Sequence, residues 1–320
     1  MSRNGVGEGR PWRRRLAFLA DRTVVLFMGV GVGAAITLAF LGGGVTRADR
    51  GRASPPAPRP AEPATPPAAC PAPIPPDLAR KVALGQPVTI GVFGDSFGDG
   101  VWAALYRRLA KDNVKVLRLS EEGTGFTRYQ VVNLEEKAAA QLEAQPVDIA
   151  VVVTGANDTE GTWDDAHAHA YALMTPKWKA VYGARIDRFV GLLRRKGAMV
   201  YWVGLPKMRK DSYDQDVAAL DDFFASRMTA LGAPFFPTRS LSSDDAGAFN
   251  LYLPDPVTKA PRLMRANDGV HMTPAGYERL AGPLIDRIRA DLARARGPSL
   301  AAPPPAPPPS GPPKTATAGS

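Results

Sequence analysis

The chain has 320 residues, 45% hydrophobic and 22% charged, a composition that excludes wholesale disorder, a collagen-like chain and a multi-pass membrane protein. Of the net charge of +9, residues 1–78 carry +5 and Lys314 one more, so residues 79–296 are nearly neutral. That balance argues against a nucleic-acid partner. The single Cys70 lies in a proline tract, which excludes an intramolecular disulfide, a zinc cluster and a cysteine-based active site in the core.

Residues 1–22 are basic, and no charged residue occurs in residues 23–46. As a helix, this uncharged stretch would reach roughly 36 Å, enough for a bilayer core of about 30 Å. A cleaved signal peptide has a shorter apolar region, about 7–15 residues, and a small-residue cleavage site. We therefore expect a single transmembrane anchor. Six arginines precede this stretch and four follow it. This excess of positive charge on the N-terminal side predicts a cytoplasmic N-terminus, a bacterial inner-membrane location and a periplasmic core.

The segments around the core are expected to carry no chemistry. Gly29 and Gly33 form a GxxxG spacing through which two membrane helices could dimerise, although glycine is common in such helices in any case. Residues 47–78 are rich in proline and alanine and should form an extended linker, in which the tract from Pro55 to Pro76 would reach roughly 70 Å when fully extended. Residues 297–320 have a similar composition and are expected to be a disordered tail.

Residues 79–296 alternate short apolar runs rich in β-formers with longer helical patterns. Strands are expected at Val88–Gly94, Val114–Leu119, Asp148–Thr154, Met199–Leu205 and Ala233–Thr238. Helices are expected near Gly100–Lys111, Val131–Gln145, Lys177–Lys196, Val217–Leu231 and Pro274–Ala295. This alternation predicts the α/β class: a three-layer α/β/α sandwich with a five-stranded parallel sheet, plus the N-terminal transmembrane helix.

Polar motifs follow the first and third expected strands. They are Gly94-Asp95-Ser96 and Gly155-Ala156-Asn157-Asp158. If the strand order is 2-1-3-4-5, as in flavodoxin-like folds, these strands flank the switch point where ligands bind. Ser96 and Asn157 should then face one crevice.

A third motif, Asp268-Gly269-Val270-His271, stands directly before a predicted helix start, which should hold His271 in a fixed place. A serine hydroxyl becomes a good nucleophile when a base takes its proton and a third group orients that base. Ser96, His271 and Asp268 can supply this catalytic set.

Together with the Gly-Thr-Gly loop at 123–125, these blocks resemble the SGNH/GDSL hydrolase superfamily in order and spacing, from about Val88 to Ala293. The stretches YWVGLP at 201–206 and DGVHMTPAGY at 268–277 resemble its bacterial membrane-anchored periplasmic branch. The resemblance implies an oxyanion hole formed by the backbone N–H groups of Ser96 and Gly125 and the side-chain amide of Asn157. Gly123 is the alternative for the loop position.

Other residues near these motifs allow both structural and functional interpretations. Asp95 and Asp158 are expected to cap turns and order loops. His167 and His169 lack the paired spacing of a zinc motif, so a solvated loop is expected and no metal. Trp163 could offer a flat surface to a sugar ring, and Arg265 could either contact an anionic substrate or order Asp268. No phosphate-binding motif occurs, so no cofactor is expected.

These expectations lead to three functional hypotheses. The leading one is a cofactor-independent serine esterase that forms an acyl-enzyme and acts on O-acyl groups of cell-envelope glycans or on small envelope esters. The second is an O-acyltransferase that passes the acyl group to a periplasmic glycan. The third is a non-catalytic envelope scaffold, against which the intact set of Ser96, Asn157, Asp268 and His271 argues.

Overall fold

The computed structural model describes residues 72–297. The expected anchor at 23–46, nearly all of the linker and the tail beyond residue 297 lie outside the described residues. None of the helices between residues 72 and 297 combines the length with the hydrophobicity that a bilayer span requires.

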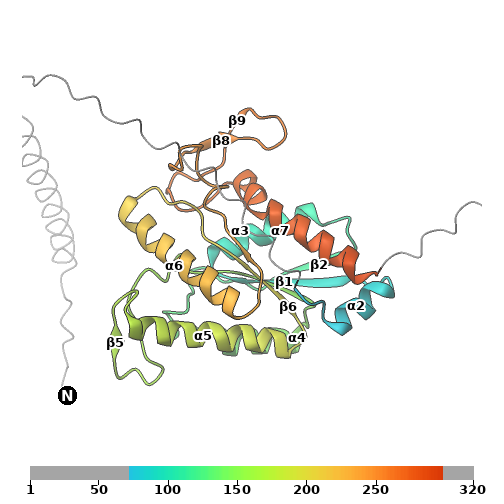
Figure 1. Ribbon diagram of the computed structural model, residues 1–320, viewed down its shortest axis with the longest axis horizontal. Helices are drawn as coiled ribbons and strands as arrows, with labels where there is room; N and C mark the ends of the chain where they lie inside the picture. The colour runs from blue at the N-terminus through green and yellow to red at the C-terminus, as the bar shows by residue number, and fades with distance from the viewer. Residues whose placement is uncertain (1–71, 298–320) are drawn as a thin grey trace, which may run out of the picture. The chain divides into compact units, whose positions relative to one another are not determined.

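Five parallel strands form the central sheet, in the order β2-β1-β3-β6-β7 (Figure 1). Counted along the chain within the sheet, this is the predicted order 2-1-3-4-5. The inner strands β3 and β6 are buried along their whole length, as expected where helices cover both faces. The strands are β1 Val88–Gly94, β2 Val114–Arg118, β3 Ile149–Val153, β6 Met199–Val203 and β7 Phe235–Phe236.

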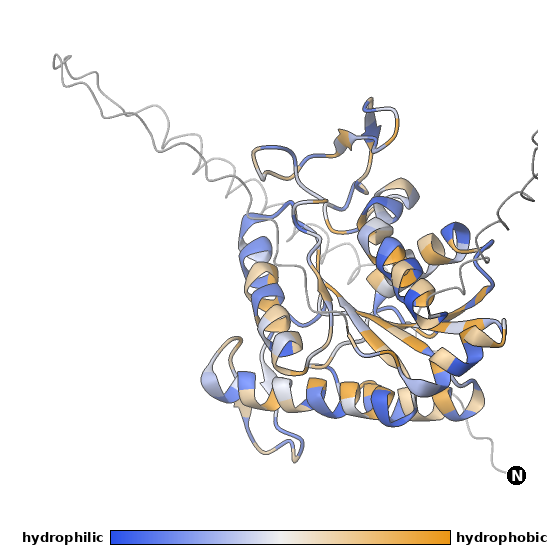
Figure 2. Ribbon diagram, turned by 45° about the vertical axis from the view of Figure 1, so that its right-hand side comes forward, coloured by the Kyte–Doolittle hydropathy of each residue, from blue (hydrophilic) through white to orange (hydrophobic). Residues whose placement is uncertain are grey.

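Helices pack on both faces of this sheet, and Figure 2 shows the hydrophobic residues gathered on the strands and on the inward sides of the helices. Consecutive residues of β6 show the two layers, because neighbouring side chains of a strand point to opposite faces. The Tyr201 hydroxyl donates to Asp291 of α7 at 2.6 Å, whereas the Trp202 ring packs 5.1 Å from Phe224 of α6. The longer helices are α3 Ser96–Arg108, α4 Leu134–Ala144, α5 Pro176–Arg195, α6 Asp211–Ala230 and α7 Pro274–Ala295.

The folded core begins before residue 79, within the segment expected to be linker. Helix α2 spans Pro76–Ala83 and buries Leu78, and the carbonyl of Ala72 accepts a hydrogen bond from Arg294 at 2.6 Å. Proline at the first helical position and an acidic residue in the first turn are helix-start signals. The surrounding prolines hid these signals in the sequence.

Helix α3 begins at Ser96, four residues earlier than the expected start near Gly100. The carboxylate of Asp95 caps it by accepting the Phe97 N–H at 2.9 Å. Gly100 weakens the helical pattern, but the packing requires it, because a Cβ at this position would lie 2.2 Å from the ring of Tyr277 in α7. This glycine lets α3 and α7 approach closely.

Two small antiparallel hairpins interrupt the α/β alternation. The first joins β4 Thr162–Trp163 to β5 Ala170–Tyr171, and the second joins β8 Tyr252–Pro254 to β9 Pro261–Leu263. In Figure 1 the β8–β9 hairpin projects away from the sheet. It leads directly into the loop that carries Asp268 and His271.

A pH-dependent stability follows from Asp221, a buried residue of α6 whose carboxylate accepts the Leu205 N–H at 2.8 Å. Burial raises the pKa of Asp221 to about 7, against the lowering effects of that N–H and of Arg239. The folded chain therefore holds this proton more tightly than the unfolded chain, whose carboxyl titrates near its ordinary value. Stability from this group is present at low pH and is lost as the pH rises toward 7.

We predict that Asp221→Asn, which keeps an oxygen for Leu205, reduces the loss of unfolding free energy between pH 5 and pH 7. The reduction should amount to at most about 1.4 kcal/mol per pH unit. Chemical denaturation at several pH values measures it. The exposed neighbour Asp222, changed to Asn, is the matched control. Equal pH slopes in the parent and in Asp221→Asn would contradict the assignment.

Candidate active site

Three polar side chains form a continuous hydrogen-bonded chain at the carboxyl end of β1. Ser96 Oγ lies 2.8 Å from His271 Nε2, and His271 Nδ1 lies 2.7 Å from Asp268 Oδ2. Ser96 is the first residue of α3, and the other two belong to the loop before α7. The fold thus brings together residues 175 positions apart in the sequence. The side chain of His271 is 39% exposed, so a substrate can reach the imidazole.

The loop before α7 fixes the imidazole from several sides. Asp268 Oδ1 accepts the backbone N–H groups of Val270 at 2.8 Å and His271 at 2.9 Å, so the same carboxylate shapes the turn and contacts the ring. The ring of Phe97 stacks on the imidazole with centroids 5.3 Å apart. When Nδ1 donates to Asp268, Nε2 is left as an acceptor for the serine proton.

Asp268 is held in its charged form. Partial burial pushes its pKa upward, but the hydrogen bonds from the His271 ring and from the backbone N–H groups of Val270 and His271 outweigh this and lower the pKa to about 2. At neutral pH the carboxylate is therefore ionised beside the imidazole.

Two of the expected oxyanion donors, Gly125 and Asn157, meet at the loop that follows β2. The Asn157 amide donates one hydrogen bond to the Thr124 carbonyl at 2.9 Å, and its second N–H has no acceptor within residues 72–297. The neighbouring Gly125 N–H is also without an acceptor in that range. Thr124 stands between Gly123 and Gly125, and the carbonyl of Gly123 accepts a hydrogen bond from Arg128 at 3.1 Å.

Asp95 and Asp158 order the loops, as expected, and both are fully buried. Besides capping α3, Asp95 accepts the Gly155 N–H at 3.1 Å and so joins the loop after β1 to the loop after β3. Burial raises the pKa of Asp95 to about 7, with the Phe97 N–H opposing and the charge of Asp158 adding to the rise.

Asp158 anchors the glycine loop. Its carboxylate accepts the backbone N–H groups of Phe126 and Thr127, at 3.1 and 2.9 Å, and the hydroxyls of Thr127 and Tyr182, at 2.6 and 2.7 Å. The loop that carries Gly125 is therefore fixed to the residue directly after Asn157.

Arg265 does not contact the crevice, and the expectation of a substrate contact is wrong. Its side chain is fully buried and donates to the carbonyls of Lys207 and Val270. The cause is local: Arg265 pairs with Met272 in a β-bridge, which turns it inward beneath the Asp268–His271 loop. The alternative expectation, that Arg265 orders this loop, agrees with its contacts.

Trp163 lies on the β4–β5 hairpin and is 45% exposed. No hydrogen bond or ring contact joins it to the Ser96, His271 and Asp268 side chains in the described part of the chain. On the same hairpin, His169 Nδ1 pairs with Asp164 at 3.1 Å. A role of Trp163 in substrate binding stays a prediction.

Arg185 of α5, which no sequence motif pointed to, braces the loop that carries Gly125. All five of its guanidinium N–H donors are used: one reaches the carbonyl of Phe126, directly after Gly125, and the others reach Thr162, Trp163 and Asp165 of the β4–β5 hairpin. The signal was present, because Arg185 interrupts the apolar stripe of its helix at a core-facing position.

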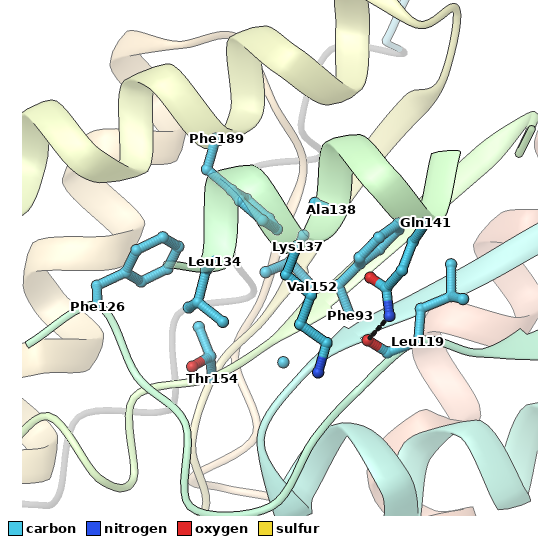
Figure 3. Close-up of a pocket in the computed structure, with 11 residues that line it drawn as sticks. Phe93, Leu119, Phe126, Leu134, Lys137, Ala138, Gln141, Val152, Thr154 and Phe189 are labelled. Carbon is cyan, nitrogen blue, oxygen red and sulfur yellow. Dashed lines mark hydrogen bonds between the residues drawn. The ribbon is translucent and has the colours of Figure 1, made fainter. Parts of the chain in front are cut away.

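A small cavity lies beneath this loop, between the sheet and helices α4 and α5 (Figure 3). Its volume is about 10 Å³, room for about one water molecule. Phe93, Phe126 and Phe189 line it, and the buried Thr154 hydroxyl has no hydrogen-bond partner among the described residues. The cavity is too small for an acyl chain, so we assign it no part in substrate binding.

The packing of Gly125 yields a stability prediction. A Cβ at Gly125 would lie 2.2 Å from Asp158 Oδ1, and that carboxylate cannot move without breaking its hydrogen bonds. Gly125→Ala should therefore lower the unfolding free energy by about 1–3 kcal/mol. The control is Gly282→Ala on α7, where no atom lies within 4 Å; it should stabilise the chain by about 0.5–1 kcal/mol. Chemical denaturation measures the unfolding free energy of both variants. If the unfolding free energy of Gly125→Ala equals that of the parent, the packing argument is contradicted.

Solved structures similar to this chain carry lipase, esterase and GDSL titles. One is a GDSL-like lipase from Bacteroides thetaiotaomicron VPI-5482, with 16% identity, 68% of this chain and 97% of that chain covered, and a TM-score of 0.42. Another is a member of the lipolytic protein G-D-S-L family from Veillonella parvula DSM 2008, with 14% identity, coverages of 62% and 97%, and a TM-score of 0.43. A third is a carbohydrate esterase family 3 structure from Talaromyces cellulolyticus, with 13% identity, coverages of 65% and 99%, and a TM-score of 0.43.

No curated protein matches the chain in sequence. A family profile described as Protein of unknown function (DUF459) matches residues 89–287, which include every residue of the candidate site. The chain belongs to this DUF459 family.

Proposed function

We propose that the chain is a serine esterase of SGNH type that hydrolyses short-chain acyl esters through an acyl-enzyme. The observation that carries this proposal is the pair of contacts at His271, 2.8 Å to Ser96 Oγ and 2.7 Å to Asp268 Oδ2. A serine, an imidazole and a carboxylate in this order are the parts that nucleophilic acyl transfer needs.

In the first half-reaction, Ser96 Oγ attacks the ester carbonyl while its proton passes to His271 Nε2. Asp268 stabilises the imidazolium that forms. The tetrahedral intermediate carries a negative oxygen, for which the backbone N–H groups of Ser96 and Gly125 and the free N–H of Asn157 are the proposed donors. When the carbonyl re-forms, the C–O bond to the alcohol breaks and the leaving alcohol takes the proton from Nε2.

In the second half-reaction, water replaces the alcohol. His271 Nε2 takes a proton from the water as its oxygen attacks the acyl carbonyl, and then returns a proton to Ser96 Oγ as the acid leaves. The start of α3 supports both halves, because Ser96 is the first residue of the helix and the positive end of the helix dipole faces the developing oxyanion.

For the substrate, we propose O-acyl groups of cell-envelope glycans or small envelope esters. Two features support this: the uncharged residues 23–46, from which we propose a single-pass inner-membrane anchor and a periplasmic core, and the exposed ring of Trp163, which could stack on a sugar. Transfer of the acyl group to an added glycan in preference to water would instead identify an O-acyltransferase.

Removal of the nucleophile gives the direct test. We predict that Ser96→Ala in the purified full chain lowers the rate of p-nitrophenyl acetate hydrolysis by at least about 10³-fold and abolishes labelling by a fluorophosphonate. The control is Ser120→Ala, a serine of the same crevice edge that bonds Asp99 instead. Hydrolysis that survives in Ser96→Ala refutes the assignment of the nucleophile. An inactive, unlabelled parent would favour the scaffold hypothesis.

The role of Asn157 can be separated from substrate binding. We predict that Asn157→Ala lowers kcat by about 10²–10³-fold with a small change in KM, because the amide donor acts on the oxyanion of the transition state. Steady-state kinetics measures both constants. A variant that loses only affinity for the ester would show that Asn157 binds substrate and does not stabilise the oxyanion.

A further inference from the structure

Arg265 is a buried cation without a carboxylate partner. Its side chain is fully buried, and no carboxylate within residues 72–297 comes within 4.0 Å of its nitrogens. The guanidinium donates to the backbone carbonyls of Val270 at 2.9 Å, Lys207 and, at the limit of a hydrogen bond, Ser242 at 3.5 Å. Its Nε has no partner among the described residues, and its flat face lies 4.6 Å from the Phe249 ring.

Such an arrangement is costly, because a charge removed from water and not paired with an opposite charge destabilises the folded state. Burial lowers the pKa of Arg265 to about 10, while Tyr277 and Asp268 raise it. Arg265 therefore remains a cation at neutral pH. An apolar side chain would pack here at lower cost, so the charge calls for a reason other than stability.

The contacts of Arg265 connect two loops at the site. On one side, Val270 stands between Asp268 and His271. On the other, Lys207 belongs to the loop that joins β6 to α6. The neighbouring Ala266 N–H reaches the carbonyl of His271 at 2.9 Å. The guanidinium thus holds the loop of the catalytic pair against the end of the sheet from within.

Arg209 holds the same loop from outside. Its backbone N–H donates to Gly269 at 3.0 Å, its side chain donates to Asn267 at 2.8 Å, and it covers Phe249 at 5.1 Å. Unlike Arg265, it is exposed. Water therefore screens the charge of Arg209, whereas the charge of Arg265 acts through the protein interior, where screening is weaker.

We propose that Arg265 is a positioning residue for the esterase reaction: it fixes the Asp268–His271 loop through Val270 and Lys207, and its unpaired buried charge favours ionised Asp268 and neutral His271. This inference rests on the proposed function. A neutral imidazole is the form that can accept the proton of Ser96, so the buried cation should extend the active pH range toward acid.

The other charged and titratable groups around the imidazole come from each element packed against it. Asp268 belongs to its own loop, Asp95 lies behind Ser96 at the start of α3, and Tyr277 comes from α7. The β6–α6 region contributes Arg209 and Asp214, and Asp214 is paired with Lys207 and Arg239, both at 2.7 Å. Among these groups, Arg265 is the buried cation that has no carboxylate within 4.0 Å in the described part of the chain.

The test uses the full chain and follows the imidazole directly, so that it does not depend on turnover. Nitrogen-15 labelled histidines are titrated by NMR in the parent and in Arg265→Gln, with His271→Gln to assign the His271 signal. We expect the titration midpoint of His271 to rise by about 0.5 pH unit or more in Arg265→Gln, while the signals of His167 and His169 stay in place. An unchanged midpoint in a folded Arg265→Gln would overturn the electrostatic role.

Arg265→Lys separates the charge from the hydrogen bonds, and it also serves if Arg265→Gln fails to fold. Lysine keeps the charge but cannot reach both carbonyls in the guanidinium geometry. In Arg265→Lys the titration midpoint of His271 should match that of the parent. The downfield Hδ1 proton signal of the bond between His271 and Asp268 should weaken or broaden. A parent-like Hδ1 signal would overturn the positioning role. The matched control is Arg262→Gln, because Arg262 is an exposed arginine of the hairpin and pairs with Asp255 at 2.8 Å. It should change neither the His271 midpoint nor the Hδ1 signal.

Ester hydrolysis measured across pH completes the experiment. If the parent hydrolyses esters, the acid limb of kcat/KM should move upward in Arg265→Gln by the shift seen in the NMR titration. If the parent is inactive but the His271 midpoint moves as expected, the proposed function fails while the electrostatic coupling stands. If hydrolysis is normal and neither the midpoint nor the acid limb moves, the inference about Arg265 fails alone.

Discussion

The hydrogen bond between Ser96 and His271 is the contact on which the rest of this site depends. It joins the start of α3, directly after the first strand of the chain, to the loop before the last helix. The two residues meet because α3 starts where β1 ends and α7 packs closely on α3 at Gly100. A shift of either helix by about an ångström would lengthen the bond beyond the usual range of 2.5–3.0 Å.

Several buried titratable side chains also support this contact, and their hydrogen bonds hold the loops of the site in place. Asp95 and Asp158 each accept a backbone N–H from a loop that is distant in sequence, Gly155 and Phe126 respectively, and Arg185 and Arg265 each donate to backbone carbonyls. Loops at a sheet edge have unpaired backbone groups that must be satisfied when water is excluded. Charged side chains make strong hydrogen bonds to such groups, at a cost in desolvation. The site is therefore rigid for electrostatic reasons as well as through packing.

The fold was largely predictable because its signals are local and periodic. The apolar runs at Val88–Gly94 and Met199–Val203 are short, β-rich and bounded by glycine, and they became strands near their expected limits. The last strand proved shorter, with two residues of the expected six at Ala233–Thr238, since only Phe235 and Phe236 pair with β6. Helix α2 was missed because proline suggests a linker even where it starts a helix. The two hairpins were missed because strands of two or three residues leave no periodic pattern.

In the candidate site, too, some residues could be predicted from the sequence and others could not. Ser96, Asn157, Asp268 and His271 could be named from sequence, because each follows a strand or precedes a helix and carries chemistry that few residue types share. Arg265 was misplaced and Arg185 was overlooked, because arginine is by default a surface residue and only the three-dimensional packing shows where a long side chain ends.

The sequence by itself determined the alternation of strands and helices, the motifs and their places at the ends of strands, since these depend on residue type and spacing along the chain. The tertiary structure decided which charges are buried, which carbonyl Asn157 contacts and which way Arg265 turns. Those outcomes depend on contacts between segments that lie tens of residues apart in the chain, and the residue pattern of a single segment does not encode such contacts.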